Sequence, residues 1–218
     1  MQYDFDVAIF DMDGTLLDTM RYWRYTSLEF LLAHQMPVRE EDLIRMHDVS
    51  SRKLLFDIAR RENVDIGGRQ EVISELEGYM NRHYLYDAHA KDGVPEFLQM
   101  LKDQGIRMCV ATGSPREYAR NGLGRLKLLD FFEFVTDNYE SGVTKDQPEY
   151  FVRLAERLGT TPQRCVVFED ALYAMESAKA AGCRVLAIEE DTAQRQREKI
   201  RQTADWYIRG YEDLLAER

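Results

Sequence analysis

Short apolar runs alternate with helical patterns along most of the chain, and this alternation is the strongest constraint on its fold. The runs cover residues 5–10, 107–111, 132–135, 165–168, 184–188 and, more briefly, 206–208. Near-continuous apolar runs of this length suit strands that are buried on both faces of a parallel sheet. Segments with one apolar helical face lie between them, as at residues 151–158 and 171–181. The sequence therefore predicts an α/β fold with a mostly parallel sheet flanked by helices.

The interval between the first two runs breaks the alternation. It contains helical patterns and no strand pattern, and it is punctuated by Pro37 and the Gly67-Gly68 pair. We therefore predict an α/β core domain from residues 1–18 and 91–218, with an all-helical cap domain inserted at residues 19–90. An insertion after the first strand is expected to overhang the carboxyl ends of the strands, where ligands bind in open α/β sheets.

Composition and charge exclude several classes of protein. The 218 residues are 44% hydrophobic and 31% charged, with a formal net charge of −10. This acidity argues against general binding to nucleic acid or to an anionic membrane. There is no secretory signal pattern and no apolar run of the roughly 20 residues that cross a bilayer. The three cysteines lack metal-type spacing, so we expect reduced thiols in a cytoplasmic protein, with a monomer as the default state.

The first candidate site is Asp11-Met12-Asp13-Gly14-Thr15, directly after the first apolar run. Two carboxylates at a strand tip, with a glycine that permits a sharp turn, can surround one reacting centre. On its own this segment fits an acidic surface turn equally well.

Two further segments also follow apolar runs or precede helices. Thr112-Gly113-Ser114 offers hydroxyl groups and a backbone N–H for binding an anion, although Ser114-Pro115 also fits a simple helix start. Lys145 lies just before the helical pattern at residues 151–158. A lysine there can balance clustered carboxylates and hold a phosphate, although a solvated surface lysine is the commoner case.

Adjacent acids end the fourth run, at Glu169-Asp170. Packing two acids together is unfavourable unless a cation compensates, and an oxygen-only ligand set favours Mg²⁺ over zinc. Taken together, the strand-end segments supply a carboxylate nucleophile, a metal site and groups that bind negative charge. This inventory is typical of phosphoryl transfer.

The ordered segments DMDGTLLDT, VATGS, a lysine followed by PEYF, and VVFEDA resemble the haloacid dehalogenase-like superfamily. More narrowly, the chain resembles the branch with a helical cap after the first strand, which includes phosphoglycolate phosphatase-like and β-phosphoglucomutase-like enzymes. The resemblance covers almost the whole chain and is strongest over residues 5–19 and 93–188. It implies a Rossmann-like core and a phosphoric monoester hydrolase.

The resemblance also implies roles for single residues. Asp11 would attack phosphorus to form an aspartyl-phosphate, and Asp13 would protonate the leaving oxygen and then activate water. An acid at position 13 favours phosphate esters over the substrates of the halide-releasing and phosphonate-cleaving members. The implied Mg²⁺ ligands are Asp11, Asp13 (through its carbonyl), Glu169 and Asp170. The implied phosphate-binding residues are Thr112, Gly113 and Lys145.

The chain departs from the family pattern at several positions. Asp146 stands where the family usually has proline, and Ala171 where it often has serine. The mutases have histidine at the position of Trp23, and their cap arginine precedes the position of Arg52 by one residue. The last two differences favour a phosphatase over a sugar-phosphate mutase.

We therefore expect a phosphatase acting on a small phosphorylated metabolite, with a mutase as the alternative and a catalytically silent binding protein as a minor one. Four residues are candidates for substrate contacts: Tyr22, Trp23, Arg52 and Arg116.

Overall fold

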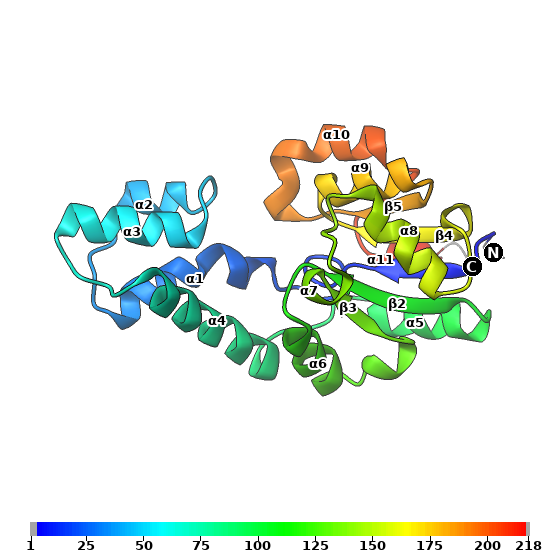
Figure 1. Ribbon diagram of the computed structural model, residues 1–218, viewed down its shortest axis with the longest axis horizontal. Helices are drawn as coiled ribbons and strands as arrows, with labels where there is room; N and C mark the ends of the chain where they lie inside the picture. The colour runs from blue at the N-terminus through cyan, green and yellow to red at the C-terminus, as the bar shows by residue number, and fades with distance from the viewer. Residues whose placement is uncertain (1–3, 217–218) are drawn as a thin grey trace. The chain divides into compact units, whose positions relative to one another are not determined.

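A computed structural model describes residues 4–216, apart from the side chains of residues 139 and 141. Its contacts divide the chain into two compact units (Figure 1). The larger unit runs up to Asp18 and resumes at His89, and the smaller one comprises Thr19–Ala88.

Six parallel strands form the sheet of the larger unit, in the order β3-β2-β1-β4-β5-β6 (Figure 1). They are β1 (Val7–Phe10), β2 (Arg107–Thr112), β3 (Val135–Asp137), β4 (Cys165–Glu169), β5 (Arg184–Ile188) and β6 (Trp206–Ile208). The predicted parallel α/β fold is confirmed. The chain winds outward from β1 to β3 and then outward in the other direction from β4 to β6. The switch between β1 and β4 is where a ligand crevice opens in sheets of this order.

Strand β3 begins three residues later than the sequence predicts. The predicted run was 132–135, but residues Leu129–Phe131 form a 3₁₀ turn and the strand covers Val135–Asp137. The ring of Phe132 instead packs edge-on against Phe10, with 6.0 Å between the ring centroids. The apolar run therefore reflects packing of a loop onto the core as well as the strand itself.

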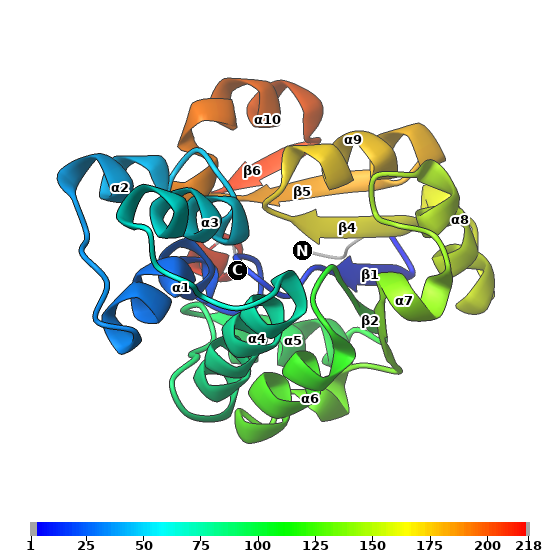
Figure 2. The same cartoon turned by 60° about the vertical axis from the view of Figure 1, so that its left-hand side comes forward.

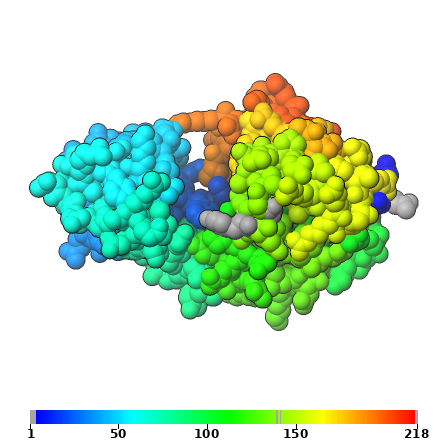
Figure 3. All heavy atoms as spheres, viewed as in Figure 1, coloured from blue at the N-terminus to red at the C-terminus, as the bar shows by residue number. Residues whose placement is uncertain are grey.

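Helices cover both faces of the sheet (Figure 2). On one face lie α8 (Pro148–Arg157), α9 (Leu172–Ala181) and α10 (Arg197–Thr203), whose surface is continuous in the space-filling view (Figure 3). On the other lie α5 (Val94–Asp103) and α6 (Arg116–Arg125). Helix α11 (Tyr211–Ala216) packs against α5, with the Tyr211 ring 5.2 Å from that of Phe97. Aromatic rings fill this second core: Phe10 stacks on Phe168 at 4.3 Å, and Phe97 lies 5.5 Å from Phe168. The short helix α7 (Asn138–Ser141) follows β3.

The smaller unit is all helical, as predicted for the insertion between the first two strands. It contains α1 (Met20–Ala33), α2 (Glu40–Arg45), α3 (Ser51–Glu62) and α4 (Arg69–Tyr86). Its own core is built from Phe30, Leu31, Met36, Met46, Leu54, Leu55, Ile58, Ala59, Val72 and Leu76. In the described part of the chain, no helix has the length and apolar character needed to cross a membrane.

Candidate active site

Asp11 is the first residue after β1, and its side chain is buried at the carboxyl edge of the sheet. Its backbone N–H donates to the Phe168 carbonyl at 2.9 Å, which extends the pairing of β1 with β4 by one residue. The ammonium group of Lys145 donates a 2.6 Å hydrogen bond to Asp11 Oδ1. Lys145 lies in the loop before α8 and is only 2% exposed, so it is not a solvated surface lysine.

Glu169 and Asp170 stand at the end of the neighbouring strand β4, and both are buried. Glu169 Oε1 accepts the backbone N–H groups of Asp170 at 3.2 Å and Ala171 at 3.1 Å. Its other oxygen, Oε2, lies 2.6 Å from Lys145 Nζ. Lys145 therefore bridges the ends of β1 and β4 across the switch point of the sheet.

The buried charges of this cluster are not balanced. Burial, together with the charge of Glu169, raises the pKa of Asp11 above its ordinary value, although Lys145 opposes the shift. Burial, followed by the charges of Asp11 and Glu169, raises the pKa of Asp170 well above its ordinary value. Burial alone would lower the pKa of Lys145, but Asp11 and Glu169 raise it well above its usual range. One permanently charged lysine thus faces three carboxylates.

The donor set fits a hard divalent cation. Asp11, Glu169 and Asp170 each offer one carboxylate oxygen, and these oxygens all lie within 4.8 Å of one another. Carboxylate oxygens without histidine or cysteine are the ligands that Mg²⁺ prefers. A divalent cation would also offset the neighbouring negative charge that, after burial, raises the pKa values of Asp11 and Asp170. The cluster is compatible with an Mg²⁺ site.

A tight turn positions Asp13. Gly14 has a φ of 82°, the left-handed conformation that glycine adopts without strain. Its N–H donates to the Leu17 carbonyl at 2.9 Å, and the N–H of Leu17 donates to the Met12 carbonyl at 2.8 Å. The turn separates Asp13 from Asp11, and Asp13 Oδ2 accepts a 2.6 Å hydrogen bond from Ser114 Oγ.

The loop after β2 brings Thr112, Gly113 and Ser114 to the same edge of the sheet. Thr112 is fully buried, and its hydroxyl oxygen accepts the N–H of Ser114 at 3.0 Å. Gly113 is exposed, and a Cβ there would meet Asn138 Nδ2 only at 3.8 Å. The glycine is therefore not required by packing within this unit. The sequence identified the loop but gave no sign that Ser114 would hold Asp13.

Two of the departures from the family pattern, at Asp146 and Ala171, have small local consequences. Asp146 is exposed and accepts a hydrogen bond from the Thr144 hydroxyl, while the neighbouring Lys145 still reaches Asp11. Ala171 keeps its backbone N–H on Glu169, so the lost serine hydroxyl leaves that contact intact.

The predicted substrate contacts lie in different places. Trp23 is half-buried in the smaller unit, where its Nε1 donates to the Tyr84 hydroxyl at 3.0 Å. Arg52 is exposed in the first turn of α3. Arg116 begins α6 in the larger unit, and its guanidinium lies 3.3 Å from the Glu140 carboxylate. Within the larger unit, the described interactions of the Arg116 side chain do not include a direct contact with the acidic cluster.

Tyr173 was missed by the sequence analysis. It lies in the first turn of α9, three residues after Asp170, and is 52% exposed. Partial burial raises its pKa to about 12, while the charge of Lys145 opposes the shift and that of Glu169 adds to it. An exposed aromatic side chain this close to the cluster is suited to contact a ligand.

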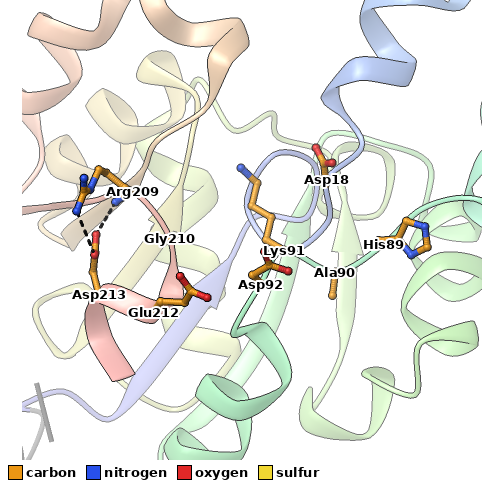
Figure 4. A pocket seen from close by; sticks show the side chains of 9 residues that line it. All are labelled: Asp18, His89, Ala90, Lys91, Asp92, Arg209, Gly210, Glu212 and Asp213. Carbon is orange, nitrogen blue, oxygen red and sulfur yellow. Dashed lines mark hydrogen bonds and ion pairs between the residues drawn. The ribbon is translucent and has the colours of Figure 1, made fainter. Parts of the chain in front are cut away.

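A separate cavity of about 540 Å³ lies in the larger unit where the chain returns from the insertion (Figure 4). It is lined by Asp18, His89, Ala90, Lys91, Asp92, Arg209, Gly210, Glu212 and Asp213. Lys91 is held there by a 2.7 Å ion pair with Glu190. Asp11, Lys145, Glu169 and Asp170 are not among the lining residues, so this cavity is distinct from the acidic cluster.

Comparison with known proteins identifies the family. Residues 5–182 match the haloacid dehalogenase-like hydrolases. The chain belongs to this family. The resemblance seen in the sequence motifs is thereby confirmed.

Two phosphatases resemble this haloacid dehalogenase-like hydrolase over most of their length. The phosphorylated carbohydrates phosphatase of Thermotoga maritima is 29% identical over 187 residues, which cover 81% of this chain and 82% of the relative. The fructose-1-phosphate phosphatase YqaB of Escherichia coli is 30% identical over 175 residues, which cover 80% of this chain and 91% of the relative. The chain is a phosphoric monoester hydrolase of this family.

The fold recurs in a solved structure of the same size. CbbY from Rhodobacter sphaeroides superimposes with a TM-score of 0.74 at 20% identity, covering 96% of each chain. At this identity the likeness concerns the fold of the haloacid dehalogenase-like hydrolase and not its substrate.

Proposed function

We propose that this hydrolase is an Mg²⁺-dependent phosphatase that cleaves a small phosphorylated metabolite through an aspartyl-phosphate at Asp11. The observation that carries the proposal is the buried Lys145 ammonium, 2.6 Å from both Asp11 Oδ1 and Glu169 Oε2. It holds one oxygen of Asp11 in place at the switch point of the sheet. Asp11 is thereby oriented beside a carboxylate pair that can hold a cation.

In the first step, a carboxylate oxygen of Asp11 attacks phosphorus. The new O–P bond forms as the bond from phosphorus to the ester oxygen breaks. Asp13 gives its proton to the departing oxygen, so the metabolite leaves as a neutral alcohol. Ser114 fixes the orientation of the Asp13 carboxyl group through the 2.6 Å hydrogen bond.

In the second step, Asp13 accepts a proton from water, and the water oxygen attacks the same phosphorus. The bond between Asp11 and phosphorus breaks, which releases inorganic phosphate and restores the Asp11 carboxylate. Asp13 ends the cycle protonated, as it began. One residue thus acts first as an acid and then as a base.

Mg²⁺, when bound, would neutralise charge on the transferring phosphoryl group and on the attacking carboxylate. Its ligands would be the Asp11 carboxylate, the Asp13 carbonyl and Asp170. Both oxygens of Glu169 already face N–H or ammonium groups, which favours a contribution from Glu169 through water.

The phosphoryl oxygens would be bound by Thr112, the N–H of Gly113 and Lys145. Thr112 ends β2 and Gly113 follows it, while Lys145 is buried in the loop before α8 and bonded to Asp11. These groups can therefore be in place before the substrate arrives.

We propose a sugar or polyol phosphate as the substrate class. The support comes from the relatives, which include a fructose-1-phosphate phosphatase and a hexitol phosphatase from Escherichia coli. In this proposal the helical insertion is a cap that selects the leaving group, with Trp23 and Arg52 as its candidate contacts, while Tyr173 is the core's candidate.

A substrate panel tests the proposal. Phosphate release would be measured from hexose, pentose, hexitol, nucleotide and short acid phosphates, with Mg²⁺ and with a chelator. We expect release from a sugar or polyol phosphate that the chelator abolishes and Mg²⁺ restores. Isomerisation of a hexose phosphate without release would establish the mutase, and no turnover of any compound would support the silent binding protein. The prediction of a cytoplasmic monomer is checked by sedimentation and fractionation.

A further inference from the structure

A second cavity, of about 320 Å³, lies along the outer edge of the sheet in the larger unit. Three arginines line it: Arg116 and Arg120 from α6, and Arg157 from the end of α8. Strand β3 lies between these two helices along the chain and forms one edge of the sheet. None of the lining residues is acidic.

The positive charge at this cavity is only partly compensated. Glu140 lies 3.3 Å from Arg116 and 3.6 Å from Arg157, so one carboxylate serves two guanidinium groups. Arg120 is exposed and has no ion-pair partner within residues 4–216. Arginine stays charged at any pH of interest, so the excess is permanent. In a chain with a net charge of −10, such a concentration of positive charge favours an anionic ligand.

The floor of the cavity is apolar. Leu129, Phe132, Phe134 and Val135 form it, and all four are partly exposed. The guanidinium carbon of Arg157 lies over the Phe134 ring, 3.7 Å from its centroid. This stacking orients a planar cation and leaves its N–H groups at the edge available for an anion.

The cavity is separate from the proposed catalytic centre. Asp11, Asp13, Lys145 and Asp170 are absent from its lining, which comes from α6, the segment before β3 and the end of α8. The cavity therefore shares no lining residue with the proposed catalytic centre.

We propose that this cavity binds a nucleoside phosphate. Its phosphate groups would bind the three arginines. Its flat, weakly polar base would stack on the apolar floor and on the Arg157 guanidinium. The volume suits a ligand of this size, because small-molecule sites begin at about 300 Å³. Inorganic phosphate would leave the floor unused, and an uncharged nucleoside would leave the arginines unused.

Calorimetric titration of the Mg²⁺-loaded enzyme tests the proposal with three probes. These are α,β-methylene-ADP, whose terminal phosphoryl group is joined through carbon and resists hydrolysis, methylenediphosphonate, and adenosine. We expect the nucleotide to bind at least about tenfold more tightly than either fragment, since one charge-assisted contact contributes a factor of this order. Binding of the nucleotide no tighter than methylenediphosphonate would overturn the assignment of the class.

Variants locate the site. Arg120→Ala and Arg157→Ala should each weaken nucleotide binding about tenfold, and Arg120→Ala removes an exposed, unpaired side chain that folding does not need. Arg153→Ala is the control, because Arg153 lies on the same helix but pairs with Glu149 at 3.0 Å. Arg120→Ala should leave phosphate release from the enzyme's best substrate unchanged. Unaltered nucleotide binding in Arg120→Ala and Arg157→Ala would overturn the proposal.

Discussion

Ser114 Oγ donates a 2.6 Å hydrogen bond to Asp13 Oδ2, and this bond links the loop after β2 to the turn after β1. Ser114 is only 7% exposed, and its own N–H is anchored on the Thr112 hydroxyl. The proposed acid and base is therefore oriented by a side chain that belongs to the proposed phosphate-binding loop.

Ser114→Ala should lower kcat roughly 10- to 150-fold and change KM little, because loss of one hydrogen bond to the charged form of Asp13 costs roughly 1.5–3 kcal/mol. Steady-state kinetics on the best substrate of the panel measures the changes in kcat and KM separately. Ser177→Ala is the matched control, since Ser177 is also buried but has no hydrogen-bond partner for its hydroxyl in the described structure. Equal kcat values for Ser114→Ala and the wild type would contradict a positioning role.

Mg²⁺ should raise the thermal unfolding temperature of the wild type, because it binds the folded cluster. At a hundred times its Kd the stabilisation is about 2.7 kcal/mol. Asp170→Asn should abolish this shift, yet in chelator it should unfold at a higher temperature than the wild type, since it removes one of three crowded carboxylates. Differential scanning calorimetry measures both effects.

Asp130→Asn, which changes an exposed acid outside the cluster, should keep the full Mg²⁺ response. An undiminished Mg²⁺ shift in Asp170→Asn would show that the cation binds elsewhere.

Lys145→Met should lower the free energy of unfolding by about 3 kcal/mol and kcat by at least about a hundredfold. The variant leaves two buried carboxylates, Asp11 and Glu169, without their cation. Lys179→Met is the control, because its ion pair with Asp205 has the same 2.6 Å length but both side chains are about a third exposed. That pair should contribute at most about 1 kcal/mol. Denaturant unfolding in Mg²⁺ buffer measures the free energy of unfolding of both variants. A similar loss in Lys145→Met and Lys179→Met would contradict the claim that burial makes the Lys145 ion pairs stronger.

Asp42 should make the smaller unit sensitive to acid. Its buried carboxylate accepts two hydrogen bonds from the Arg61 guanidinium, at 2.8 and 2.7 Å, and the N–H of Arg39 at 3.0 Å. The hydrogen bonds from Arg61 hold the pKa of Asp42 below its ordinary value, despite burial. A depressed pKa contributes stability that is complete above the unfolded pKa of about 3.9 and is lost as pH falls through the folded value.

The stability difference between the wild type and Asp42→Asn should therefore be constant near neutral pH and shrink below about pH 4. This stability difference is measured at each pH by urea unfolding, with amide hydrogen exchange in α2 and α3 as the probe. A difference that does not change between neutral and acid pH would contradict the assigned pKa direction.

Much of the fold could be predicted because the central strands are continuous apolar runs. Residues of β1 and β4 are buried on both faces, so their sequence carries the parallel-sheet signal directly. The acidic cluster was predictable for the same reason. Asp11 directly follows β1, Glu169 ends β4 and Asp170 follows it, and parallel strands bring their carboxyl ends to one edge.

Contacts between distant residues could not be predicted in this way. Ser114 meets Asp13 across 101 positions, and Trp23 meets Tyr84 across 61. Periodicity identifies which face of an element is buried but not which polar side chain it meets. The start of β3 was misplaced for a related reason. Phe132 lies in a loop and packs on Phe10, so its apolar side chain resembles that of a strand residue in the sequence.

Trapping the covalent intermediate tests the central proposal most directly. The enzyme would be mixed with its best substrate and Mg²⁺, quenched with acid within one turnover and treated with borohydride, which reduces an aspartyl-phosphate to homoserine. Peptide mass spectrometry should find homoserine at position 11 in the wild type, more of it in Asp13→Asn, and none in Asp11→Asn. Homoserine at another aspartate, or substantial turnover by Asp11→Asn, would contradict Asp11 as the nucleophile.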